Sequence, residues 1–177
     1  MLDLPHTRFS RWVDLRLTQI GEITSWLWLL LLAVIVLNVV MRYAFGEGRI
    51  EFEELQWHIY ATGFLIGLSF ANVQDAHVRV DVVRARLPAT VQAWIEWYGI
   101  LLLLLPFVVL VLIYSLPFIE YSFVTSEVSE APGGLPYRWL IKAVLPIGFL
   151  LLPLSALARL SRVAKFLFGS LPAEKTS

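Results

Sequence analysis

The sequence predicts an all-α integral membrane protein with four transmembrane helices and an amphipathic surface helix near its N-terminus. Hydrophobic residues make up 58% of the 177 residues and charged residues only 16%, whereas about a quarter of a soluble domain is charged. The apolar residues also gather in blocks of about 20 residues, which at about 1.5 Å per residue cover the roughly 30 Å hydrocarbon core of a bilayer. A soluble fold could not bury several such blocks.

Four apolar blocks are the predicted spans. They cover approximately residues 25–44, 54–73, 93–116 and 139–160. The second block is the most diluted by polar residues, and the alternative for it is a re-entrant segment. The spans form a membrane domain over 25–160, between a cytoplasmic N-terminal segment at 1–24 and a cytoplasmic tail at 161–177.

The N-terminal segment carries an apolar arc on a helical wheel, and Arg8, Arg11 and Asp14 lie off it. The arc consists of Phe9, Trp12, Val13, Leu17 and Ile20. A helix of this kind rests in the headgroup plane of a membrane. The alternative is a frayed tail.

The Lys and Arg residues predict the orientation, because they concentrate on the cytoplasmic side of membrane proteins. The residues on the side of the termini and of the loop after the second span are Arg8, Arg11, Arg16, Arg79, Arg84, Arg86, Arg159, Arg162, Lys165 and Lys175. The residues on the opposite side are Arg42, Arg49, Arg138 and Lys142. This distribution predicts that both termini are cytoplasmic.

A few residues inside the spans predict contacts between helices. Asn38 lies within the first span, where a polar side chain usually bonds to another helix. In the second span, Gly63, Gly67 and Ala71 recur every four residues, and this spacing lets two helix backbones approach closely. We expect this face to pack either within the bundle or against a partner.

Charged residues near the span ends predict anchoring rather than catalysis. Glu53 and Glu54 open the second span, where the helix dipole favours carboxylates. Glu54 and His58 are one turn apart, so a proton relay is the alternative. Glu96 and Lys142 lie near span ends, where we expect them to reach water. No charge lies in the middle third of any predicted span, although ion pathways usually carry one.

The composition excludes several kinds of site. The formal net charge is zero, so no basic field attracts nucleic acid. There is no cysteine, and His58 and His77 are about 28 Å apart along one helix, too far to share one haem iron. We therefore predict no catalytic residue, no cofactor and no metal site.

The residues after the first span resemble the small, DctQ-type membrane subunit of tripartite ATP-independent periplasmic (TRAP) transporters. The similarity begins at Arg42, continues through the Glu53–Glu54 pair and includes a His-x-x-Val-Asp segment from His77 to Asp81. It extends over about residues 27–160. The segment 126–139 resembles the branch that handles 2-oxo acids and related monocarboxylates.

The resemblance implies a function that composition does not. In this family a periplasmic binding protein captures an organic acid, and a large multi-span subunit carries it inward along a sodium or proton gradient. The small subunit is a scaffold that packs against the large subunit among membrane lipids and helps to dock the binding protein. It would lie in the bacterial inner membrane.

On the periplasmic side, a set of charged residues becomes the candidate docking surface. The candidates are Glu127, Glu130, Arg138 and Lys142. Arg138 and Lys142 are one helical turn apart, so both can point the same way. The alternative is that both cations contact lipid phosphates.

Two other functions compete with the transporter subunit. One is the membrane anchor of a respiratory enzyme, which the missing histidine pair argues against. The other is a small self-assembling channel, which the missing charged pore lining argues against.

Overall fold

The computed structural model describes residues 4–74 and 87–169, and these residues form helices and connecting loops without a β-strand. This confirms the predicted all-α class. The helical elements are α1 (Arg8–Ala44), α2 (Ile50–Val73), α4 (Ala89–Tyr98), η1 (Gly99–Leu104), α5 (Leu105–Val124) and α6 (Arg138–Phe168). The elements α4, η1 and α5 follow one another without a break, so they form one long helical column.

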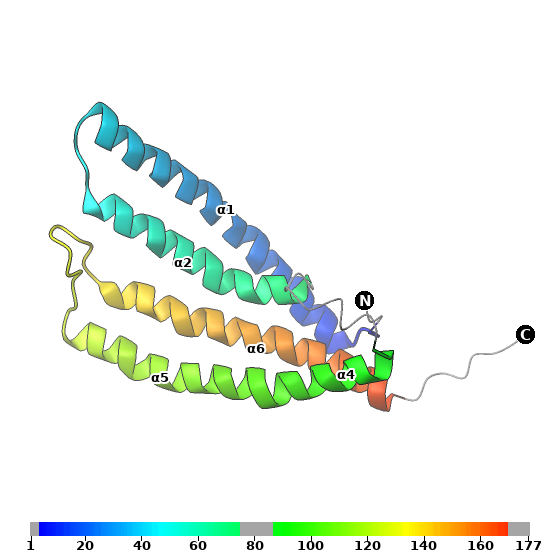
Figure 1. The fold of residues 1–177 in the computed structure, drawn as a ribbon. Coiled ribbons are helices and arrows are strands. Elements are labelled where there is room, and N and C mark those ends of the chain that lie inside the picture. The colour runs from blue at the N-terminus through cyan, green and yellow to red at the C-terminus, as the bar shows by residue number, and fades with distance from the viewer. Residues whose placement is uncertain (1–3, 75–86, 170–177) are drawn as a thin grey trace, which may run out of the picture.

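The helices lie side by side in the order α1, α2, α6 and α5, as a single layer (Figure 1). Helix α6 is central because it packs against α1, α2 and the α4–α5 column, whereas α5 has no comparable contact with α1 or α2 in the described residues. The layer has two ends. Loops 45–49 and 125–137 lie at one, the loop end, and the start of α1, α4 and the close of α6 lie at the other, the terminal end (Figure 1).

Helix α1 is longer than the predicted first span. The side chain of Thr7 caps it through a capping box with Ser10, and the helix continues unbroken from the N-terminal segment into the span. The predicted surface helix is therefore the first part of α1 and not a separate element. Gly21 lies within this helix, and its missing side chain leaves room for the ring of Phe70 in α2.

The predicted apolar arc of the N-terminal segment divides in the structure. Val13 and Leu17 are buried in a cluster with Ala158 of α6, whereas Phe9 and Trp12 are exposed. The segment therefore packs against the helix layer through one side. Ile20 packs against the same cluster, whereas Phe9 and Trp12 are free to contact a membrane.

The column from Ala89 to Val124 changes its helical register near Pro106. Proline has no backbone N–H, and its ring collides with the carbonyl four residues earlier. The chain adopts the wider π-helical form over Gly99–Leu104, immediately before this residue. A π-helical turn is a usual way to absorb such a mismatch.

In the part of the chain that the structure describes, three helical stretches are long and apolar enough to cross a membrane, namely Arg8–Ala44, Ala89–Val124 and Arg138–Phe168. Helix α2 has 24 residues but is not among them, since polar residues such as Gln56 and Asn72 dilute its apolar sequence. It nevertheless lies within the layer, between α1 and α6 (Figure 1). Helix α6 extends to Phe168, so the predicted tail from residue 161 begins as helix.

Candidate functional site: the loop end

Glu54 fixes the loop 125–137 to α2. Its side chain is buried, and its carboxylate accepts hydrogen bonds from the Ser129 hydroxyl and from the Leu135 backbone N–H. A Cβ atom at Gly134 would lie 2.4 Å from the Cβ of Ser129 and 3.0 Å from Glu54 Oε1. Only glycine fits at this position, so the loop closes tightly around the carboxylate.

Glu127 makes a second connection, between the loop and the start of α6. Its carboxylate accepts a hydrogen bond from the Lys142 ammonium, and Arg138 Nε lies 3.9 Å from its Oε1 atom. The Lys142 side chain is 13% exposed, and its Nζ atom lies 4.1 Å from the centre of the Phe118 ring. The bond from Lys142 holds the pKa of the Glu127 carboxyl below its usual value.

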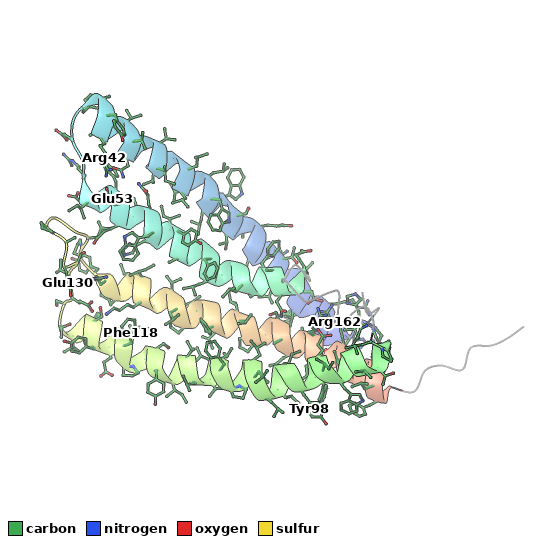
Figure 2. The ribbon with its side chains drawn as sticks, viewed as in Figure 1. Arg42, Glu53, Tyr98, Phe118, Glu130 and Arg162 are labelled. Carbon is green, nitrogen blue, oxygen red and sulfur yellow. The ribbon has the colours of Figure 1, made fainter. Side chains whose placement is uncertain are left out.

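A third connection joins α1 to α2. Arg42, in the last turn of α1, pairs with Glu53, in the first turn of α2. Figure 2 shows both residues at the loop end, on the side of the layer where α1 turns into α2. The resemblance grouped these two residues, and the fold brings them into contact.

The four docking candidates differ in their contacts and in their exposure. Glu127 and Lys142 pair with each other. Lys142 therefore contacts a carboxylate, whereas the prediction was that it reaches water. Arg138 lies beside this pair and is partly exposed. Glu130 is exposed on the loop (Figure 2). His77 and Asp81 lie outside the described residues.

The alternative of a proton relay between Glu54 and His58 is not supported by the contacts of these two side chains. The Glu54 carboxylate is directed to the loop, and His58 Nδ1 instead lies within hydrogen-bond distance of the Glu54 backbone carbonyl. Within the described residues, no group of three or more His, Cys, Asp or Glu side chains could hold a metal ion. The polar side chains at the loop end instead connect the loop 125–137 to α2 and α6.

The predicted packing residues behave differently from one another. A Cβ atom at Gly63 would lie 3.3 Å from the ring of Trp28, so this glycine serves contact between α1 and α2, whereas a Cβ atom at Gly67 would meet nothing within 4 Å. Ala71 is partly buried. Asn38 is buried as expected, but its Oδ1 atom has no hydrogen-bond partner within the described chain.

The expected interhelical amide bond is made elsewhere. Asn72 of α2 donates a hydrogen bond of 2.7 Å to the Ser155 hydroxyl of α6. The prediction chose Asn38 because it interrupts an apolar block. Asn72, at the end of its span, gave no such signal.

Two ion pairs at the terminal end were missed by sequence reasoning. Glu96 of α4 pairs with Arg159 of α6, and both side chains are largely buried. Glu96 therefore does not reach water, contrary to the prediction. Asp14 of α1 lies 3.6 Å from Arg162 of α6. Figure 2 shows Arg162 at the end of the layer opposite Arg42. Opposite charges at the ends of separate apolar helices are the one signal that could have suggested these pairs.

Together, the apolar helical layer and its structural ion pairs define a small α-helical membrane protein with no recognisable catalytic constellation in the described residues. The family model for the DctQ component of tripartite ATP-independent periplasmic transporters matches residues 31–166. The chain belongs to this family, as the resemblance indicated, and is a small membrane component of a TRAP transporter. No curated protein matches the chain.

Proposed function

We propose that the chain is a non-catalytic scaffold that packs against the large transport subunit and helps to dock the periplasmic binding protein. The transporter would take up an organic acid, a 2-oxo acid or another monocarboxylate, driven by an ion gradient. Family membership supports the scaffold function. The single-layer fold adds support, because most of its large apolar side chains remain exposed and available to lipid or to a partner.

The proposal includes four spans, with α2 as the fourth. Its 24 residues extend about 36 Å as an α-helix, enough to cross a bilayer. It also lies between α1 and α6, so neighbours that span would carry it across with them. In the inner membrane, the loop end would face the periplasm and the terminal end the cytoplasm, in agreement with the Lys and Arg distribution.

The observation that carries the docking proposal is the way the loop 125–137 is held. Glu54 and Glu127 fix it to α2 and α6, while Glu130 stays exposed on it. A surface that is ordered before binding loses less entropy when a partner docks. The loop end thus offers a formed acidic surface to a water-soluble protein.

The docking proposal is tested by charge reversal in the reconstituted transporter. Glu130→Lys should raise the concentration of binding protein required for half-maximal uptake by about tenfold and leave the maximal uptake unchanged, because charges at the rim of an interface act mainly on association. Glu120→Lys, an equal reversal at an exposed site on α5, is the control. If both variants match the wild type at low and high salt, Glu130 does not contact the binding protein.

A further inference from the structure

Three arginines in the first part of α1 have no anionic partner in the described residues. Arg8, Arg11 and Arg16 are exposed, and none of them forms an ion pair there. Arg16 has only a neutral partner, the side-chain oxygen of Gln19 at 3.4 Å. Like charges one turn apart, as at Arg8 and Arg11, destabilise a helix. Anions from outside the chain would remove this repulsion.

The other basic side chains that the structure describes all have a partner. Those at the loop end pair with glutamates, namely Arg42, Arg49, Arg138 and Lys142. Those of α6 at the terminal end bond to Glu96, Asp14 and the carbonyl of His6, namely Arg159, Arg162 and Lys165. The three arginines of α1 are therefore the described cations that the chain itself leaves unpaired.

Exposed apolar side chains lie among these arginines. Trp12 and Leu15 are each 58% exposed, and at about 100° per residue they fall on the same side of the helix as Arg8. Arg11 and Arg16 lie on either side of this stripe, and the side that packs against α6 lies opposite. We call these five residues the Arg8–Arg16 face.

This face differs from the apolar arc that the sequence predicted. Helix α6 covers much of that arc, because Val13 and Leu17 are buried against Ala158 and Ile20 packs on the same cluster. The side left to a membrane is centred on Trp12 and includes Leu15, which the arc did not contain. The rotation of α1 on α6 therefore decides which apolar side chains stand beside the unpaired arginines.

The ion pair between α1 and α6 places this face at the level of the lipid headgroups. From Trp139 to Arg159 of α6 is about 30 Å at about 1.5 Å per residue, the thickness of the hydrocarbon core. Arg162, about one turn further, pairs with Asp14, and Figure 1 shows the start of α1 beside the close of α6. The Arg8–Arg16 face surrounds Asp14 in sequence. It therefore lies just beyond the hydrocarbon, where tryptophan is enriched.

We propose that the Arg8–Arg16 face binds anionic phospholipid headgroups at the cytoplasmic surface of the membrane. The guanidinium groups would pair with the phosphates, while Trp12 and Leu15 would enter the boundary between headgroups and acyl chains. Anionic lipids give the cytoplasmic leaflet a negative surface potential, which attracts such basic segments. The proposal rests on the proposed arrangement of the layer in the membrane, and it adds the class of lipid that contacts α1.

Quenching by brominated lipids measures which lipid contacts this face. The chain has no cysteine, so Leu15→Cys in the full chain can carry a single fluorophore. In vesicles of equal parts phosphatidylcholine and phosphatidylglycerol, the quenching observed when one lipid or the other is brominated gives the preference of the site. Phosphatidylglycerol should be preferred at least about fivefold, the factor that one arginine near an anionic surface supplies.

Two matched controls separate this preference from a general attraction to the protein. Tyr43→Cys carries the same label at a site that is 82% exposed, beside an arginine that pairs with Glu53, and it should show no preference. Replacing Arg8, Arg11 and Arg16 together by glutamine should abolish the preference at position 15. Equal quenching by the two brominated lipids at position 15, with the three arginines present, would overturn the proposal.

The same label in the complete transporter tests the alternative occupant, an acidic surface of the large subunit. Quenching at position 15 should persist there, with the same preference for phosphatidylglycerol. Its loss on assembly would show that the large subunit covers the face, and this would also overturn the proposal. Failure of the scaffold function would instead appear as absence of the large subunit when the chain is purified, so the two failures are distinguishable.

Discussion

The carboxylates of Glu54, Glu96 and Glu127 show how single residues act in this chain. Each lies near the end of a helix and bonds to a group that is distant in sequence or on another element: Ser129, Arg159 and Lys142. A charge in partly apolar surroundings is costly unless it is paired. The pairs therefore specify which helix ends meet, and they leave the central parts of the helices apolar.

A dependence of stability on pH follows from the Glu127–Lys142 pair. Because Lys142 lowers the pKa of Glu127 below its usual 4.5, the pair stabilises the folded protein above that value. This stabilisation is lost as the pH falls through the lowered folded-state pKa. The wild type should melt at a higher temperature than Glu127→Gln near about pH 7, and the difference should shrink as the pH falls below 4.5.

Calorimetry or fluorescence-detected melting in detergent would measure this difference. Lys142→Met is the matched control, because it removes the same pair from the other side and should show the same convergence with the wild type at low pH. A difference between the wild type and Glu127→Gln that stays constant down to about pH 3 would show that the pair does not control the effect.

Among the elements, α6 organises the fold and α1 depends on it. The buried residues of α6 are mostly small, including Gly148, Ser155, Ala156 and Ala158, so neighbouring helices approach it closely. A Cβ atom at Gly148 would lie 2.9 Å from the backbone oxygen of Leu65 in α2. The first part of α1 is held to α6 by an apolar cluster and by the Asp14–Arg162 pair.

This dependence predicts a strong effect of truncating Leu17. Leu17→Ala should destabilise the chain by about 2–5 kcal/mol, the usual cost of removing a large buried aliphatic side chain, and it should expose the N-terminal segment to protease. Leu15→Ala, at a site that is 58% exposed, should change neither quantity. Similar melting temperatures for the two variants would show that the cluster around Ala158 contributes little.

At the scale of the whole molecule, the single layer explains why so little of the chain is buried. In the most apolar stretches of the three long helices, 11–17% of the residues are buried within the chain. A soluble protein with this much exposed apolar surface would aggregate. The layer is therefore suited to lipid on some surfaces and to another membrane protein on others, as the proposed scaffold function requires.

The orientation of the layer can be tested by labelling, since the chain has no cysteine. We predict that a cysteine replacing Glu130 reacts with an impermeant thiol reagent on intact spheroplasts, whereas a cysteine replacing Arg11 reacts only after permeabilisation. Both sites are exposed in the chain, so burial does not bias the comparison. Labelling of the Arg11 position on intact spheroplasts would contradict the proposed orientation.

The sequence by itself determined the helical class and the family. Apolar blocks long enough to cross a bilayer leave few alternatives to helices, and the segment from Arg42 to Asp81 carried the resemblance. The sequence also placed Arg42 close to Glu53, because one lies at the end of the first helix, the other at the start of the second, and a short turn joins the two helices. These properties depend on local composition and on short separations along the chain.

The tertiary structure decided which residues meet across the layer. Glu54 bonds to Ser129 and Leu135, and no periodicity in the sequence relates residues so far apart. The glycine spacing of α2 likewise did not show that Gly63 faces α1 while Gly67 stays open. Helix rotation and the choice of neighbours are set by packing against α1 and α6, and that packing depends on side chains from several helices at once.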